Sequence, residues 1–197
     1  VPAARWAEGD WRLASDRLLE QLNAYSAAIA PPRRGQVGLD RLAEAWPERA
    51  AGLPLETPYE ALVLASIIEK ETAKPDERPA IAGVFVRRME RGMRLQTDPT
   101  VIYGIGPDFD GNITRKHLRT DTPYNTYTRR GLPPTPIAMA GRAAIHAALH
   151  PADGDELFFV ATGLGDGSHK FSVSKDEHDA AVAEYLQRLR ERRRQGR

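Results

Sequence analysis

Hydrophobic and polar residues alternate with a helical period in several segments of the chain, and this pattern predicts a mostly helical protein. In residues 10–30, Trp11, Leu18, Leu22 and Tyr25 fall on one side of a helix that Pro31-Pro32 ends. Further helices are predicted over residues 39–46, 58–73, 77–91 and 141–149 and from Ser174 onward, where Ser174 and Glu177 form a capping box.

Two short apolar segments predict strands. They are LFFVAT (157–162) and KFSVS (170–174), joined by the glycine-rich GLGDG (163–167). The glycine-rich segment leads to a strand and not to a helix, so a hairpin turn is predicted in preference to a phosphate-binding loop. Residues 107–141 are rich in Pro, Gly, Asn and Thr and predict a functional loop region. The predicted class is α+β, mainly helical with a small antiparallel sheet.

The clearest boundaries surround the helix at 58–73. Thr57, Pro58 and Glu60 have the order of a capping box, and Lys74-Pro75 disfavours helix at its end. Asp76 is the predicted cap of the next helix. Asp98, before Pro99, is predicted to open a short helical turn at 100–104.

The end of the helix at 58–73, LASIIEKETA, carries two glutamates. With about 100° per residue and Leu64 at zero, Glu71 falls at about −20°, within the apolar stripe that Ala61 and Ile68 share. Glu69 falls at about 140°, off the stripe, and is predicted to lie at the surface, where an ion pair contributes little.

An inward-facing glutamate has two explanations. Near a helix end it can still reach water or a buried arginine, which is a structural role. Alternatively, partial desolvation favours its neutral form and raises its pKa, so that it holds a proton near neutral pH as a general acid. Glycosidases keep their catalytic acid protonated in this way. The wheel alone leaves both explanations open.

Composition narrows the function classes. Hydrophobic residues make up 41% and charged residues 28%, as in soluble globular proteins, and the net charge of +1 argues against nucleic-acid binding driven by bulk charge. There is no cysteine, and no apolar run has the length of a membrane span. The five histidines lack metal-ligand spacing, so neither a metal nor another cofactor is predicted.

Three stretches in order carry a family resemblance: ASIIEKETAKPDERPAIAGVFVRRMERGMRLQTDPTVIYG, TPYNTYTRRGLPPTPIAMAG and HPADGDELFFVATGLGDGSHKFS. They resemble the catalytic domain of the bacterial endolytic murein transglycosylases, over about residues 58–190. In that family the catalytic acid is the glutamate directly followed by a small hydroxyl residue. Here this is Glu71, followed by Thr72, and the helical wheel selects the same glutamate.

The resemblance implies a lytic enzyme that cleaves the β-1,4 bond between N-acetylmuramic acid and N-acetylglucosamine in glycan strands and leaves a 1,6-anhydro end. Glu71 would be the sole general acid and base. The residues expected to bind substrate have amide, acid, hydroxyl or phenol groups: Thr72, Gln96, Asp98, Tyr124, Asn125 and Tyr127. Two alternatives remain, a hydrolytic muramidase that uses Glu71 with Asp98 and a non-catalytic wall-binding module.

The domain organisation and location are also expectations. Residues 57–197 are expected to form the catalytic domain, and residues 1–56, which match the family poorly, an N-terminal helical segment of uncertain relationship. Family members usually carry a membrane-spanning helix and a small LysM-like domain, which we do not recognise in this chain. The resemblance implies an envelope enzyme at the outer face of the cytoplasmic membrane, with glycan strands as substrate and cell-wall synthases as partners.

Overall fold

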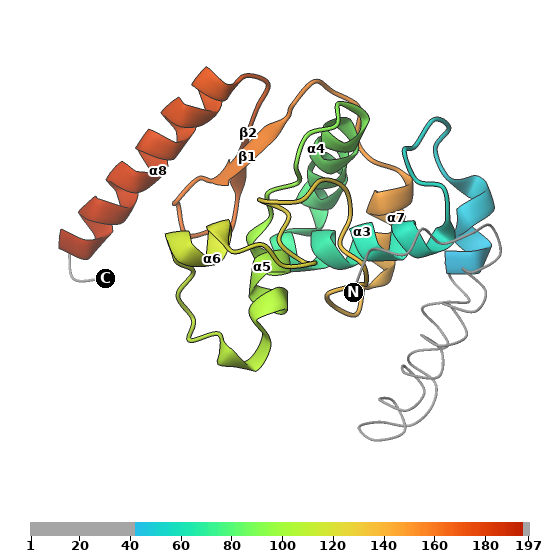
Figure 1. The fold of residues 1–197 in the computed structure, drawn as a ribbon. Helices are drawn as coiled ribbons and strands as arrows, with labels where there is room; N and C mark the ends of the chain where they lie inside the picture. The colour runs from blue at the N-terminus through green and yellow to red at the C-terminus, as the bar shows by residue number, and fades with distance from the viewer. Residues whose placement is uncertain (1–41, 195–197) are drawn as a thin grey trace.

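The computed structural model describes residues 42–194, which form a mainly helical fold with one two-stranded antiparallel sheet (Figure 1). The elements are α3 (Pro58–Glu71), α4 (Arg78–Glu90), α5 (Asp98–Ile105), α6 (Arg115–Arg119), α7 (Arg142–Leu149), β1 (Phe158–Ala161), β2 (His169–Ser172) and α8 (Lys175–Arg194). The predicted α+β class is confirmed. The helix predicted over residues 10–30 lies outside the described residues. None of the helices between residues 42 and 194 combines the length and apolar character needed to cross a membrane.

Helix α3 is the centre of the core. It packs most extensively against α7 and also contacts α4 and α5. Leu64, Ile67 and Ile68 are fully buried, as the wheel predicted, but so are Val63 and Ala65 on the other sides of the helix. Because neighbouring helices cover α3 on several sides, its burial extends well beyond a single apolar stripe.

The capping box that starts α3 is confirmed. The backbone N–H of Glu60 donates to Thr57 Oγ1 (3.2 Å), and the N–H of Thr57 donates to Glu60 Oε2 (3.3 Å). The helix ends at Glu71, two residues earlier than predicted. Thr72 is extended and its hydroxyl accepts the N–H of Lys74 (3.0 Å), a local hydrogen bond that competes with another helical turn.

Two predicted caps were wrong by one residue. Asp76 lies within a 3₁₀ turn, Pro75–Glu77, and the N-cap of α4 is Glu77, which makes no side-chain cap. The N-cap of α5 is Thr97, while Asp98 is the first helical residue. In both helices a proline takes the second helical position, Pro79 in α4 and Pro99 in α5, where its missing N–H costs no intrahelical hydrogen bond.

The predicted hairpin is confirmed by the antiparallel pairing of β1 with β2, in which Phe159 faces Phe171. It lies between α4 and α8 (Figure 1). Phe85 of α4 meets Phe159 edge-on, with 5.8 Å between ring centroids. The capping box at the start of α8 is also present, with the N–H of Glu177 donating to Ser174 Oγ (3.2 Å) and that of Ser174 to Glu177 Oε2 (3.4 Å).

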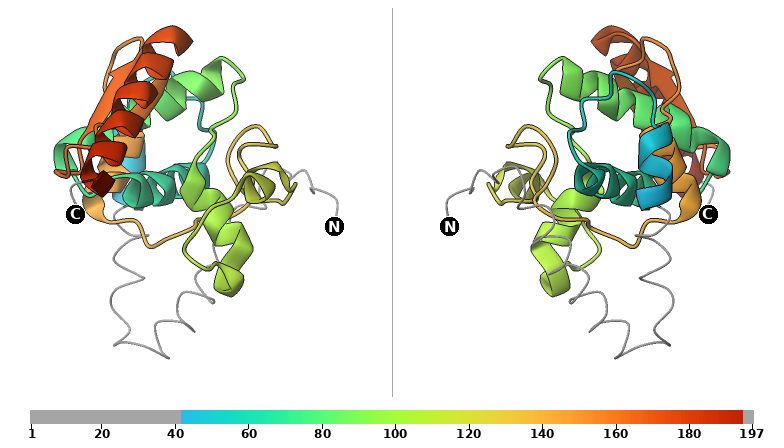
Figure 2. Two further views of the ribbon diagram at one scale, coloured as in Figure 1. Left: turned by 90° about the vertical axis from the view of Figure 1, so that its left-hand side faces the viewer. Right: turned by 90° about the vertical axis from the view of Figure 1, so that its right-hand side faces the viewer.

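The stretch from residue 107 to 141 is irregular apart from α6. Figure 2 shows α8 and the hairpin on one side of α3 and the loop region with α6 on the other. Two bonds fasten the end of this stretch to α3: the N–H of Ile137 donates to Ser66 Oγ (2.9 Å) and that of Gly141 to Glu69 Oε2 (3.1 Å). The last residues of this stretch are therefore fastened to the second half of α3.

Candidate active site

Glu71 lies where three segments meet. It is the last residue of α3, and its Oε1 accepts a short hydrogen bond from the hydroxyl of Thr97, the N-cap of α5. The backbone N–H of Thr97 in turn donates to Thr126 Oγ1 (3.0 Å) in the loop after α6. The side chain of Thr97 makes no cap bond to its own helix, so its hydroxyl is committed to the glutamate.

Burial raises the pKa of Glu71 from 4.5 to about 7. The Thr97 hydrogen bond acts in the opposite direction because it stabilises the ionised form, the nearby charge of Asp98 raises the pKa further, and Arg88 lowers it. The position at the C-terminal end of α3 also disfavours a negative charge, because that end of a helix is the negative pole of its dipole. The carboxyl group can therefore hold a proton at neutral pH.

Arg88 is a residue of the site that sequence reasoning missed. It is 7% exposed and donates to three backbone carbonyls, those of Leu157 (2.6 Å), Leu95 (2.7 Å) and Arg94 (3.2 Å). Within residues 42–194, no ion pair joins it to Glu71. Arg88 is thus a fixed positive charge near Glu71 that leaves the acid free to take up and release a proton. The sequence offered one hint, an arginine inside the otherwise apolar face of helix 77–91.

Thr97 was also missed, although its neighbours Gln96 and Asp98 were both selected. Its own signal was weak, because a threonine before an Asp-Pro pair already has a structural explanation as a helix cap.

Asp98 and Tyr127 form a second pair beside the acid. The phenol of Tyr127 donates to Asp98 Oδ1 at 2.6 Å, and burial followed by this hydrogen bond raises the pKa of Tyr127. The charge of Asp98 raises the pKa of Glu71, and the charge of Glu71 raises the pKa of Tyr127. The three side chains therefore share one site. Of the residues selected from the sequence, these are the ones that the fold brings together.

Gln96 adjoins this site in an unusual conformation. It is exposed and has a φ of 54°, in the left-handed region, as the one non-glycine residue described with a positive φ. Its Oε1 lies 3.5 Å from an Arg88 nitrogen, and its N–H donates to the carbonyl of Thr126 (3.2 Å). A left-handed residue with a long polar side chain next to Thr97 is the pattern of strain retained at a functional site.

Thr72 and Asn125 are buried, and their hydrogen bonds go to protein groups next to the site. Thr72 is 5% exposed, and its hydroxyl accepts from Lys74 and donates to Glu77 (3.4 Å). Asn125 is 1% exposed; its amide nitrogen donates to the carbonyls of His117, Leu118 and Thr120, and its oxygen accepts the N–H of Tyr127 (2.9 Å). The hydrogen-bonding groups of Asn125 are used in shaping the loop that presents Tyr127, so its geometry is that of a support.

Glu69 points to the opposite side of the last turn of α3. Its Oε2 accepts the N–H of Gly141 (3.1 Å), the residue before α7, and its Oε1 lies 3.8 Å from Arg78. The side chain is 29% exposed, so it lies at the surface and also fastens the loop end to α3.

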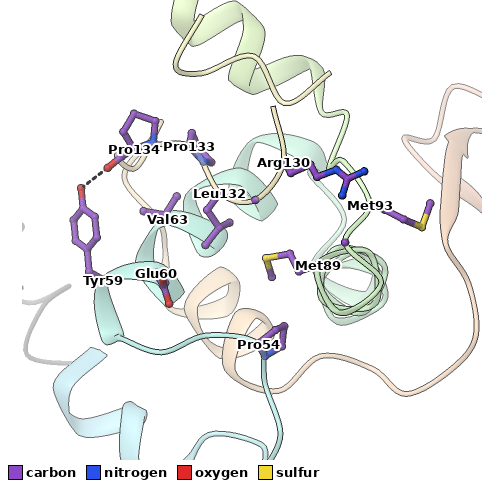
Figure 3. A pocket seen from close by; sticks show the side chains of 12 residues that line it. Pro54, Tyr59, Glu60, Val63, Met89, Met93, Arg130, Leu132, Pro133 and Pro134 are labelled. Atoms are coloured by element: carbon purple, nitrogen blue, oxygen red, sulfur yellow. Dashed lines mark hydrogen bonds between the residues drawn. The ribbon is translucent and has the colours of Figure 1, made fainter. Parts of the chain in front are cut away.

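A separate pocket of about 450 Å³ lies along the first half of α3 (Figure 3). One wall is held by the hydroxyl of Tyr59, which donates to the carbonyl of Pro134 (3.1 Å). Met89 and Met93 form an apolar wall, with Arg130 near the rim. Glu71 does not line this pocket, so the pocket and the acid are distinct features of the same side of the fold.

Comparison with known proteins identifies the family. The model of the YceG-like family matches residues 19–184. The chain belongs to the YceG-like family. The matched range takes in residues 19–56 as well as most of the stretch, about residues 58–190, that carries the family resemblance.

Two relatives carry the same name. The chain is 42% identical over 128 residues to the endolytic murein transglycosylase of Bacillus subtilis, an alignment that covers 65% of this chain and 35% of the relative. It is 35% identical over 135 residues to the endolytic murein transglycosylase of Streptococcus pneumoniae, covering 66% of this chain and 24% of the relative. The chain therefore spans about a quarter to a third of the length of these curated relatives.

A solved structure agrees in fold. The crystal structure of a YceG-like protein from Listeria monocytogenes matches 72% of this chain and 42% of its own, with a TM-score of 0.60 and 39% identity. The predicted family resemblance is confirmed.

Proposed function

We propose that this chain is the catalytic part of an endolytic peptidoglycan transglycosylase with Glu71 as its general acid and base. The observation that carries the proposal is the Glu71 carboxyl group, desolvated at the end of α3 and with its pKa raised to about 7. The names of the relatives from Bacillus subtilis and Streptococcus pneumoniae supply the substrate class.

In the proposed reaction, protonated Glu71 transfers its proton to the glycosidic oxygen as the bond from that oxygen to the anomeric carbon of N-acetylmuramic acid breaks. The 6-hydroxyl of the same muramyl residue forms the new bond to the anomeric carbon. Its proton passes to the Glu71 carboxylate, which restores the acid. The products are a free 4-hydroxyl and a 1,6-anhydro end, and no water is consumed. One carboxyl group suffices because the nucleophile belongs to the substrate.

The polar groups around Glu71 fit this double role. Thr97 holds the carboxyl in one orientation and stabilises its ionised state once the proton has left. The fixed guanidinium of Arg88 favours the same state from a distance, without an ion pair that would keep the acid permanently ionised. Burial and Asp98 favour the protonated state before the reaction. A pKa near the working pH lets the same group serve in both directions.

A hydrolytic muramidase is the competing reaction, with Asp98 activating water. Asp98 is close enough for its charge to raise the pKa of Glu71, but one of its oxygens accepts the Tyr127 phenol. This contact holds the carboxylate in place and occupies one of the oxygens that could accept a proton from water. We therefore assign Asp98, with Tyr127 and the exposed Gln96, to substrate positioning.

Mass spectrometry of muropeptides tests the proposal. Purified peptidoglycan is digested with the wild-type chain, Glu71→Gln and the matched control Glu69→Gln. We expect anhydro-muramyl ends from the wild type and from Glu69→Gln, and a loss of at least about a hundredfold for Glu71→Gln. Reducing muramyl ends, one water heavier, would establish the muramidase instead. Binding to peptidoglycan without any cleavage by the wild type would leave a wall-binding module.

The setting of the activity follows from the same assignment. We propose that the enzyme acts on glycan strands at the outer face of the cytoplasmic membrane and works beside cell-wall synthases. Co-purification of the synthases with a tagged chain from envelope extracts tests the partnership.

A further inference from the structure

An exposed aromatic pair lies next to the site but outside its chemistry. Tyr103 of α5 is 45% exposed, and its ring lies 4.9 Å from that of Tyr124, centroid to centroid, with 58° between the ring planes. We call Tyr103 and Tyr124 the aromatic shelf. Both rings belong to segments that already build the site: α5 begins at Thr97 and Asp98, and the loop of Tyr124 continues to Tyr127.

A hydrogen bond of its hydroxyl group holds Tyr124, one of the two rings of the aromatic shelf. The Tyr124 hydroxyl is 2.8 Å from Thr135 Oγ1, and the nearby Tyr59 hydroxyl donates to the carbonyl of Pro134, the bond drawn in Figure 3. Two tyrosines thus fasten the Pro134–Thr135 segment through their hydroxyl groups. These bonds, together with the packing of the half-buried Tyr124 ring against the hydrophobic core, set the orientation of Tyr124 before any ligand arrives.

Gly104 allows the two rings to meet. A Cβ at this position would lie 3.1 Å from Tyr124 Cβ and 3.2 Å from Thr122 Oγ1, closer than ordinary contacts. The absence of a side chain lets α5 approach the loop closely enough for Tyr103 to reach Tyr124. The hydroxyl of the exposed Tyr103 makes no hydrogen bond to any residue from 42 to 194, so it is open to a ligand.

The distance from the acid suits an extended ligand. Tyr103 is five residues beyond Asp98, which is about 7.5 Å along the helix axis. A group stacked on the aromatic shelf is therefore offset along α5 from Asp98, and we assign it to another unit of the strand than the sugar that reacts at Glu71. Ring faces flanked by hydroxyl groups match a pyranose, which offers apolar C–H faces and a rim of hydroxyls.

We propose that Tyr103 and Tyr124 form a stacking subsite for a pyranose ring of the glycan strand, separated along the strand from the bond that is cut. This subsite rests on the proposed transglycosylase function. It makes cleavage depend on strand length, since only strands that reach the aromatic shelf gain its binding energy.

The test uses peptide-free glycan strands separated by length, with the wild-type chain, Tyr103→Ala, Tyr103→Phe and the control Leu186→Ala, an exposed residue (43%) on α8. For Tyr103→Ala we expect KM on long strands to rise about two- to tenfold with kcat unchanged, and no change on the shortest strands that are cut. Tyr103→Phe keeps the ring and should retain most of the affinity; Leu186→Ala should equal the wild type. Binding of long strands to Glu71→Gln, with and without Tyr103→Ala, measures the same loss without turnover.

The possible outcomes separate the two proposals. If the wild type cleaves strands and Tyr103→Ala equals it at every length, the subsite is refuted and the transglycosylase assignment stands. An equal loss at all lengths, or a loss of kcat alone, would also refute the subsite, because it would indicate a structural role. The same comparison is repeated on strands that carry stem peptides: a loss seen there and not on the peptide-free strands would place peptide, and not sugar, on the aromatic shelf. If the wild type cleaves nothing, the proposed function itself fails.

Discussion

The two glutamates in the last turn of α3 face different surroundings. Glu69 accepts a hydrogen bond from the N–H of Gly141 and forms an ion pair with the guanidinium of Arg78, and part of its side chain reaches solvent. Glu71 is half-buried, and its hydrogen-bond donor among residues 42–194 is the hydroxyl of Thr97; burial outweighs this bond and raises its pKa. Both are acids of the same helix, two residues apart. The partners that the fold supplies, and not the residue type, separate a carboxylate that fastens a loop from one that can exchange a proton.

The largest expected effect concerns the pH dependence of cleavage. The acid must be protonated in the free enzyme, and the pKa of Glu71 is raised to about 7. We therefore expect kcat/KM to fall about tenfold per pH unit above pH 7. A pH–rate profile of the wild type and of Glu69→Gln measures this. The two profiles should share the alkaline limb, and a limb that moved with Glu69→Gln would show that the contrast between the two glutamates is wrong.

The free energy of unfolding should also depend on pH, because the pKa of Glu71 differs between the folded and the unfolded chain. Glu71 ionises near 4.5 in the unfolded chain and near 7 in the fold, so the native state binds the proton more tightly. Its stabilising contribution is complete below about pH 4.5 and is lost as the pH rises through about 7, a change on the order of 2–3 kcal/mol. Glu71→Gln removes this change and should be more stable than the wild type at pH 8.

Urea denaturation at pH 5 and pH 8 gives the free energies of unfolding for this comparison. Leu186→Ala, which alters no titrating group, serves as the control and should follow the wild-type pH dependence. A large loss of stability in Glu71→Gln at both pH values would instead return Glu71 to a structural role.

Thr97→Ala sharpens the comparison by removing the hydroxyl that, within the described part of the chain, donates to Glu71. The hydrogen bond lowers the pKa of Glu71, so its loss should move the alkaline limb of the pH–rate profile to higher pH. Because the bond also orients the carboxyl group, we expect cleavage at pH 7 to fall by about tenfold. Thr97→Ser keeps the hydroxyl and should retain both the limb and most of the rate. A normal profile for Thr97→Ala would mean that the bond to Glu71 does not matter for catalysis.

The smallest effect is expected at Gln96, in the segment between α4 and α5, where the backbone adopts a left-handed conformation. Gln96→Gly should be more stable than Gln96→Ala by about 1 kcal/mol, because glycine adopts a φ of 54° without steric cost and alanine does not. Both variants lose the side chain and should bind glycan less tightly than the wild type. Thermal denaturation and KM values on one strand preparation measure the two effects separately; equal stabilities would refute the strain.

Much of this protein could be predicted from local signals. The Thr57 and Ser174 capping boxes fixed two helix starts, the glycine-rich segment fixed the hairpin, and helical periodicity selected Glu71 over Glu69. These signals are readable because the interactions behind them join residues a few positions apart. The misplaced caps at Asp76 and Asp98 come from the same short range, where a neighbouring residue can take the same position.

The tertiary structure alone decided the surroundings of the acid. Thr97 is 26 residues from Glu71, and Tyr127 is 29 residues from Asp98. Arg88 reaches across 69 residues to the carbonyl of Leu157. Asn125, polar and in a loop, could be read as facing a sugar, yet its amide is spent on backbone carbonyls. The sequence by itself thus determined that Glu71 and not Glu69 lies on the apolar stripe of its helix. Its pKa, its donor and the charge near it depend on which distant segments exclude water around it, and helical periodicity carries no information about them.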